Sequence, residues 1–223
     1  MHYNYSDLLN TMNRWPAVAG LFAAPFYFAL IITLGALEPG FNHLTTPMSL
    51  LGGVPGMRGL VFNLGVATTG VLIIIFGIGL WRKLPAKAPA NFGVGLLQMG
   101  GLGLIGAGYF HCNEACRNVL AEPDLVGRLH LITSLLAGMG TATAPFFIWA
   151  AMRHSKNWQS YASLTLVAAI LANLPGITFW LTIFTDYRLE SIEGLLQRLG
   201  FIVLLIWIFF VAARLWRLAP HDE

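Results

Sequence analysis

The segment Tyr-Phe-His-Cys-Asn-Glu-Ala-Cys-Arg, residues 109–117, separates two long apolar runs of the chain, 92–110 and 127–151. It contains both cysteines. An apolar run of about 20 residues is long enough for an α-helix to cross a bilayer. A short polar segment between two such runs is therefore expected at a membrane surface, where one helix ends and the next begins.

The same pattern continues on both sides of this segment. Hydrophobic residues make up 57% of the 223 residues and charged residues only 10%, whereas soluble domains are about a quarter charged. The sequence therefore predicts an all-α, polytopic membrane protein with six transmembrane helices in one domain, 1–223, and with the bilayer as its main partner. The predicted spans are 17–37, 59–81, 92–110, 127–151, 161–184 and 194–216.

The basic residues favour one orientation of these helices, because cytoplasmic loops of membrane proteins are enriched in Lys and Arg. Five of the 13 basic residues belong to the first, third and fifth loops and the adjoining helix ends. The other eight belong to the termini and the second and fourth loops: Arg14, Arg82, Lys83, Lys87, Arg153, Lys156, Arg214 and Arg217. Both termini are therefore expected in the cytoplasm. The basic residues form no run typical of nucleic-acid binding, so no nucleic-acid partner is expected.

Two regions differ in composition from an ordinary membrane helix. The run 92–110 contains seven glycines, which lower helix propensity in water but let helices approach closely in a membrane. It is therefore expected to be a central helix. The first loop, 38–58, is rich in Pro and Gly, which argues against a helix there.

Cys112 and Cys116 lie in the third loop, which the predicted orientation puts on the oxidising side of the membrane, where disulfides persist. On a regular helix their Cβ atoms would be about 6 Å apart, whereas a disulfide needs about 3.8 Å. Either the segment is a turn and a disulfide closes it, or it is helical and the thiols are free for metal or redox chemistry. The disulfide is the preferred interpretation, because Asn113 suits a turn.

Three histidines are expected at the same end of the helices: His43, His111 and His130. Three imidazoles and a carboxylate, such as Glu114 or Asp124, would suit a tetrahedral zinc site, and the metal would lower the pKa of a bound water. Two of them, His111 and His130, could instead be axial ligands of a haem. The third interpretation is that all are interfacial histidines bonded to loop carbonyls. The sequence requires no cofactor; zinc and haem are the two options.

His130 and Ser134 lie four residues apart and so share one face of a helix. A histidine there could deprotonate the serine, but an activated serine needs a third group that orients the histidine. Contacts of this kind within a helix are usually structural. Ser49, in the first loop, could cap a helix or contact a ligand.

Three polar residues near the same end lie inside apolar runs: Asn63, Gln197 and Arg198. Polar side chains are costly when they face lipid, so these are expected to face the interior of the helix bundle. They could form interhelical hydrogen bonds there or line a polar pocket. The Arg198 guanidinium could bind a phosphate or carboxylate head group or pair with a nearby acid.

Several motifs stand at the ends of the runs: PGFNH (39–43), PMSLLG (47–52), FNLG (62–65), FHCNEAC (110–116), His130 and GLLQR (194–198). With these motifs the chain resembles, over nearly its whole length, a six-helix membrane family called domain of unknown function 998 (DUF998). The family pattern has an acid-Pro-Gly turn between the cysteines, which Asn113-Glu114-Ala115 replaces here. The resemblance implies a multi-pass protein of the cell inner (cytoplasmic) membrane, and it implies no activity.

These residues together predict a binding or transport protein for a lipid-like amphipathic molecule. The expected pocket faces outward and is lined by eight candidate residues: His43, Ser49, Asn63, His111, His130, Ser134, Gln197 and Arg198. Three alternatives stay open. The protein could be a metal-dependent intramembrane hydrolase acting on a lipid, with the three histidines as ligands; a haem or quinone redox protein; or a non-catalytic membrane subunit. The sequence does not decide whether the protein is an enzyme.

Overall fold

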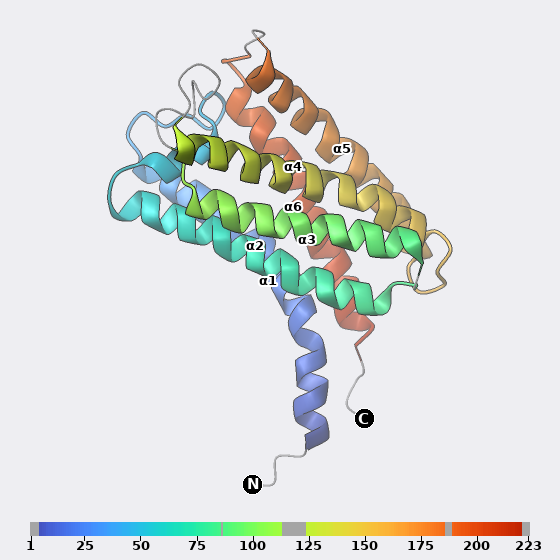
Figure 1. Cartoon of the computed structure of the whole chain (residues 1–223). Helices are drawn as coiled ribbons and strands as arrows, with labels where there is room; N and C mark the ends of the chain where they lie inside the picture. The colour runs from blue at the N-terminus through green and yellow to red at the C-terminus, as the bar shows by residue number, and fades with distance from the viewer. Residues whose placement is uncertain (1–4, 86, 113–123, 186–188, 220–223) are drawn as a thin grey trace.

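The computed structural model describes residues 5–85, 87–112, 124–185 and 189–219. Within these ranges the chain forms six long α-helices, one short 3₁₀ helix and no strand (Figure 1). Each long helix coincides with a predicted apolar run and is long and apolar enough to cross a membrane. The all-α, six-helix prediction is confirmed, and the chain is a multi-pass membrane protein. The bounds are α1 Tyr5–Leu37, η1 Met48–Gly53, α2 Met57–Lys83, α3 Ala88–Tyr109, α4 Leu125–Met152, α5 Gln159–Phe184 and α6 Glu193–Arg217.

Helix α1 begins earlier than the sequence indicates. The apolar run starts at residue 17, but the helix begins at Tyr5 and continues through Pro16 and Pro25. Its membrane-spanning part is Arg14–Leu37, and the turns before it project beyond the other helices (Figure 1). Prolines are tolerated inside membrane helices because neighbouring groups satisfy the carbonyls that they leave unpaired.

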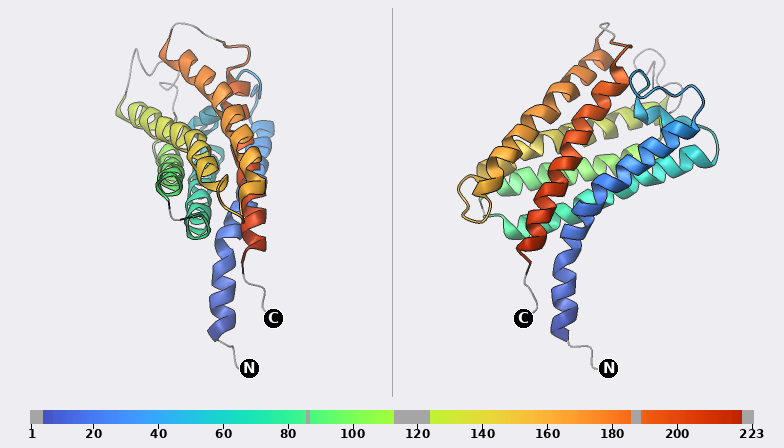
Figure 2. Two further views of the ribbon diagram at one scale, coloured as in Figure 1. Left: turned by 90° about the vertical axis from the view of Figure 1, so that its right-hand side faces the viewer. Right: turned by 180° about the vertical axis from the view of Figure 1, so that it is seen from behind.

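The helices form a closed ring in which each packs against the next in sequence, and α6 returns to pack against α1 (Figure 2). Consecutive helices run antiparallel, so the connections alternate between the two ends of the bundle (Figure 1). We call the end that carries residues 38–56 and the starts of α4 and α6 the first-loop end. The end of α2 at Leu84 and the turn at 153–158 lie at the opposite end.

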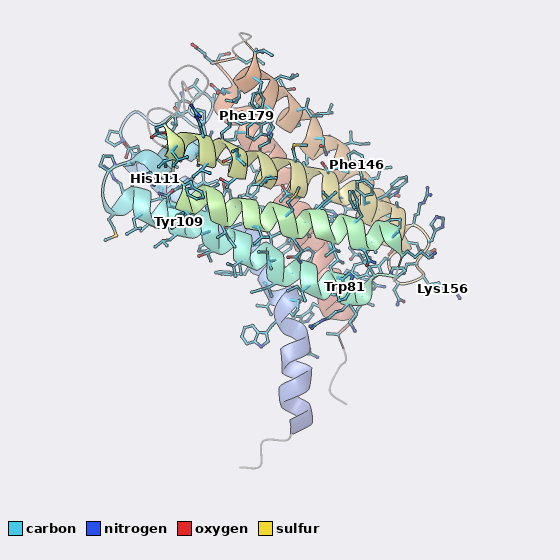
Figure 3. The ribbon with its side chains drawn as sticks, viewed as in Figure 1. Trp81, Tyr109, His111, Phe146, Lys156 and Phe179 are labelled. Carbon is cyan, nitrogen blue, oxygen red and sulfur yellow. The ribbon has the colours of Figure 1, made fainter. Side chains whose placement is uncertain are left out.

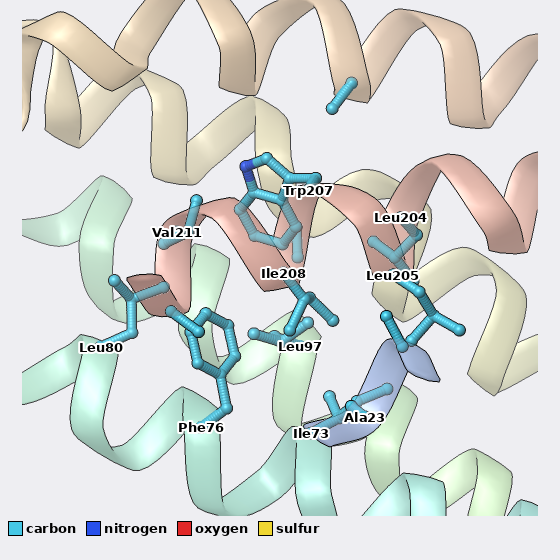
Figure 4. Close-up of a cluster of buried hydrophobic side chains, with 14 of the residues drawn as sticks. Ala23, Ile73, Phe76, Leu80, Leu97, Leu204, Leu205, Trp207, Ile208 and Val211 are labelled. Atoms are coloured by element: carbon cyan, nitrogen blue, oxygen red, sulfur yellow. The ribbon is translucent and has the colours of Figure 1, made fainter. Parts of the chain in front are cut away.

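Large buried side chains fill the space between α2, α3 and α6 (Figure 4). Phe76 of α2 and Trp207 of α6 meet edge to face, with ring centroids 6.5 Å apart. The indole Nε1–H of Trp207 donates to Thr165 Oγ1 of α5 over 3.1 Å. This bond matters because a buried indole N–H without a partner would be costly.

Glycines bring the backbones of α3 and α4 into contact. A Cβ on Gly140 would lie 2.6 Å from Leu96 O and 2.7 Å from Gly100 N, closer than real Cβ atoms approach other atoms. Side chains at such positions would force the helices apart. The glycine-rich helix α3 packs against α2 and α4, as each helix of the ring packs against two neighbours, so the ring does not single it out as a central helix.

The first loop contains a short helix that its composition argued against. Residues Met48–Gly53 form the 3₁₀ helix η1, a form that occurs in short pieces. Gly40 and Gly56 on either side have φ angles of 75° and 81°, which glycine adopts without strain. The prediction of a helix-free loop was wrong here. These glycines form bends on either side of η1, and the segment between the bends can therefore be helical.

Helices α4 and α5 meet at residues 153–158 and diverge toward the first-loop end (Figures 1 and 2). Part-way along, Asn173 joins them: its Nδ2 donates to Ala142 O of α4 and to Ala169 O of its own helix, each over 2.7 Å. Pro175 follows inside α5. The polar contact thus joins the two helices part-way along their length.

Candidate functional site

A cavity of about 870 Å³ lies where α4 and α5 diverge. The volume falls within the range of small-molecule sites, about 300–1,000 Å³. Its apolar wall includes Met139, Ala142, Ile177, Phe179, Trp180, Ile183, Phe201 and Leu204. Its polar lining lies mainly at the first-loop end and includes Thr45, Thr46, Ser49, His130, Ser134, Glu190, Glu193 and Gln197; Thr141, Thr143 and Asn173 lie deeper along the helices. The cavity is therefore mostly apolar along its helices, and most of its polar groups lie at one end.

This cavity brings together half of the predicted ligand-binding residues. Four of the eight candidates line it: Ser49, His130, Ser134 and Gln197. The other four are not among its lining residues: His43, Asn63, His111 and Arg198. The positive charge expected in the pocket is therefore not part of its lining.

His130 is buried near the start of α4 and makes contacts through both ring nitrogens. Nδ1 lies 2.7 Å from Phe110 O and 3.3 Å from Ala107 O, at the end of α3. A carbonyl oxygen only accepts hydrogen bonds, so Nδ1 carries the proton. In the neutral ring Nε2 is then an acceptor, and Ser134 Oγ lies 3.2 Å from it.

Arg198 fastens the first loop to α6. Its side chain is only 6% exposed, and Nη1 donates to His43 O, Thr46 O and Gly194 O over 2.7, 2.8 and 2.7 Å. The guanidinium also lies over the Phe41 ring, with its carbon 5.3 Å from the centroid. These contacts direct the charge at backbone carbonyls. Because every residue has a carbonyl, the pattern of residue types could not indicate these partners.

Gln197 and Asn63 bind the same loop from two different helices. Gln197 Oε1 accepts from the Met48 backbone N–H over 2.6 Å. Asn63 Nδ2 of α2 donates to Gly52 O over 2.9 Å. Gln197 and Asn63, which were predicted to line a pocket, thus hold η1 against the bundle. Of the three polar residues Asn63, Gln197 and Arg198, only Gln197 also lines the cavity.

His43 lies in the first loop beside Arg198 and away from the cavity. Its ring meets the Phe41 ring edge to face, with centroids 5.1 Å apart. A Cβ on Gly35 of α1 would lie 2.6 Å from His43 Cε1, so glycine makes room for the imidazole. Burial, and after it the positive charge of Arg198, lower the pKa of His43.

The three predicted metal ligands are not assembled into one site. Within the described part of the chain, no three His, Cys, Asp or Glu side chains gather closely enough to hold a metal ion. His111 is exposed just after α3, at the first-loop end with Tyr109, while Trp81 and Lys156 mark the opposite end (Figure 3). His130 is engaged by Ser134 and the end of α3.

Only one of the two cysteines is among the described residues. Cys112 is 2% exposed and lines the cavity. Cys116 lies outside the described residues, as do Glu114 and the turn between the cysteines. The disulfide between Cys112 and Cys116 therefore stays a prediction.

Two aromatic residues of the cavity were missed by the sequence reasoning. Trp180 of α5 lies across Gly138 of α4, with its Nε1 3.0 Å from the place where a Cβ on Gly138 would be. Tyr27 of α1 donates its hydroxyl to Met48 Sδ over 3.3 Å and meets the Phe201 ring edge to face. Aromatic residues inside apolar runs usually serve packing, so no sequence signal separates these two from the core.

The comparisons with known proteins identify a family but no activity. The family model described as "Protein of unknown function (DUF998)" matches residues 21–214. No curated protein and no solved structure matches the chain. The match covers most of the chain and includes all the motifs noted above, so the protein belongs to the DUF998 family.

Proposed function

We propose that this protein binds an amphipathic, lipid-like molecule in the cavity between α4 and α5. The observation that supports this most strongly is the change in lining within one cavity of about 870 Å³, from apolar along the helices to polar at the first-loop end. An acyl chain matches the apolar part and a small polar head matches the other. Sites of this kind combine an apolar wall with a few polar groups that fix orientation.

Access from the bilayer is supported by exposed apolar residues on the cavity wall. Met139 of α4 and Ile177 of α5 line the cavity, and each is 56% exposed. Large apolar side chains at a gap between two membrane helices would contact lipid tails. An opening between the two helices would let a lipid-like molecule enter without passing through water.

The first loop acts as a cap over the polar end of this cavity. Arg198, Gln197 and Asn63 hold it through hydrogen bonds to its backbone. We infer that this end faces outward from the cytoplasmic membrane, because the basic residues favour cytoplasmic termini. The head group would then lie at the outer surface, beneath the cap.

The test compares two Gly→Leu variants: one places a leucine inside the cavity, and the other places it on an exposed helix face outside the cavity. Gly176 of α5 lines the cavity, and a Cβ there meets nothing within 4 Å. Gly95 of α3 is exposed away from the cavity, and its Cβ also meets nothing. Gly176→Leu should therefore fill the cavity without a clash, and Gly95→Leu is the matched control.

The probe is an NBD-labelled monoalkylglycerol ether, whose fluorescence rises when it leaves water. The purified wild-type protein should bind it, and Gly176→Leu should weaken binding about tenfold, because displacing two methylenes costs about 1.5 kcal/mol. Gly95→Leu should bind like the wild type. Equal binding by Gly176→Leu and the wild type, or no binding by the wild type, would contradict the proposal.

A further inference from the structure

The polar end of the cavity contains a serine hydroxyl that is paired with an imidazole. Ser134 Oγ lies 3.2 Å from His130 Nε2. The adjacent Thr133 makes the usual contact of a helical hydroxyl, donating to Leu129 O of its own helix over 2.8 Å. The hydroxyl of Ser134 is thus directed at a base on the cavity wall.

The histidine is held in the tautomer that a general base needs. Its Nδ1–H donates to Phe110 O over 2.7 Å, with Ala107 O at 3.3 Å. The lone pair therefore sits on Nε2 and faces the serine. An activated serine requires a nucleophile, a base and a group that orients the base, and here carbonyls at the end of α3 take the third role.

A hydrogen-bond donor lies one helical turn from the serine. Gly138 shares the face of Ser134 on α4, and Trp180 Nε1 is 3.0 Å from the position of a Cβ on Gly138. Both Ser134 and Trp180 line the cavity. Among the described residues, no hydrogen bond occupies this indole N–H. It is available to the carbonyl oxygen of a bound molecule.

We propose that Ser134 is a nucleophile that accepts the acyl group of an amphipathic carboxylic ester bound in the cavity. His130 is the base, and the Trp180 N–H stabilises the negative charge that develops on the ester carbonyl oxygen. The inference rests on the proposed function, because the ester must first occupy the cavity. It adds a reaction and a substrate class to the binding site.

The chemistry balances with the ester and water as the only reactants. Ser134 Oγ attacks the carbonyl carbon while its proton moves to His130 Nε2. The bond from the carbonyl carbon to the alkoxy oxygen then breaks, and the leaving alcohol takes that proton. Water from the polar end attacks the acyl-serine with His130 again as base, which releases the carboxylic acid and restores the serine.

The experiment treats the purified full-length protein with an alkyl fluorophosphonate and locates the adduct by peptide mass spectrometry. The reagent forms a bond from Oγ to phosphorus and releases fluoride, while the proton goes to His130. The wild type should be modified on Ser134, and Ser134→Ala should not be modified. Ser163→Ala, which removes an exposed serine of α5 outside the cavity lining, should react like the wild type.

His130→Gln should slow the reaction about a hundredfold, the usual size of a general-base contribution. Trp180→Phe should slow it as well, because it removes the donor and keeps the ring. Wild-type protein without an adduct on Ser134 would overturn the inference, whether or not the variants fold. An adduct that forms equally fast in folded His130→Gln would also overturn it.

Binding of the ether probe separates this inference from the proposed function. The ether has no acyl group, so its binding by the wild type tests the cavity without the reaction. Binding of the ether without any adduct on Ser134 would refute the nucleophile and leave the binding site standing. Failure of the wild type to bind the ether would refute the binding site itself.

Discussion

Replacing Arg198 with Met should loosen the first loop and leave the cavity able to bind its ligand. The guanidinium donates to carbonyls of the loop and of α6, not into the cavity. Met keeps much of the apolar stem and removes the charge and the donors. The variant therefore distinguishes a residue that fastens the loop from one that binds an anionic head group.

The size of the stability loss in Arg198→Met follows from the number of N–H groups that the guanidinium can donate. Nη1 of Arg198 carries two hydrogens, so it makes at most two full bonds among its three carbonyl contacts. Bonds to charged groups are worth about 1.5–3 kcal/mol each, so about 3–6 kcal/mol is lost. Within the described residues, Nε and Nη2 are buried without a hydrogen-bond partner, and removing them relieves about 2–3 kcal/mol. With the midpoints of these two ranges, the expected net loss in free energy of unfolding is about 2 kcal/mol.

Two measurements check this prediction. Unfolding in mixed detergent micelles gives the free energy, and hydrogen exchange of residues 41–46 reports on the loop, which should exchange about tenfold faster in the variant. Arg58→Met is the matched control. Arg58 also donates to a carbonyl, Leu37 O, and pairs with Glu38 over 3.0 Å, but it is exposed, so its loss should cost at most about 1 kcal/mol.

One result would refute the reasoning about Arg198. If Arg198→Met unfolds with an unchanged free energy, exchanges at the wild-type rate and no longer binds an anionic lipid probe, the guanidinium is a ligand group. The role inferred from the sequence alone would then be correct. A stability loss with intact binding of the ether probe supports the structural role.

Two further predictions concern pH and topology. Burial and Arg198 lower the pKa of His43 below its ordinary value of 6.5. Between the pKa of the folded imidazole and 6.5, the unfolded chain therefore binds more protons than the folded one. Stability should fall as pH decreases from about 6.5 until the folded imidazole is itself protonated. His43→Gln should reduce this slope of unfolding free energy against pH; an identical slope would contradict the prediction. A membrane-impermeant amine reagent should leave the protein unlabelled on intact cells and label it in opened membranes, whereas labelling of intact cells would reverse the topology. All three lysines belong to the end expected in the cytoplasm: Lys83, Lys87 and Lys156.

The role of each polar residue depended on partners that residue types do not reveal. Asn63, Gln197 and Arg198 were rightly expected inside the bundle, since polar side chains avoid lipid. Their partners are backbone groups of the first loop. Every residue has such groups, so nothing in the spacing of side chains indicates that this loop folds back over the helix ends.

The cavity also depended on tertiary structure. It lies where α4 and α5 diverge toward the first-loop end (Figure 1), and a divergence between two helices leaves no pattern in either apolar run. The pairing of His130 with Ser134 was predictable from their spacing of four residues. The carbonyl of Phe110 that orients the imidazole was not, because it belongs to the end of another helix.

By itself, the sequence determined the six helices and their approximate ends. A bilayer accepts only segments that satisfy their own backbone hydrogen bonds, so an apolar run of sufficient length must be a helix whatever its neighbours do. Only the tertiary structure decided which side chains of different segments meet. Those contacts depend on helix tilt and on the path of the first loop, which are set by packing between segments far apart in the chain.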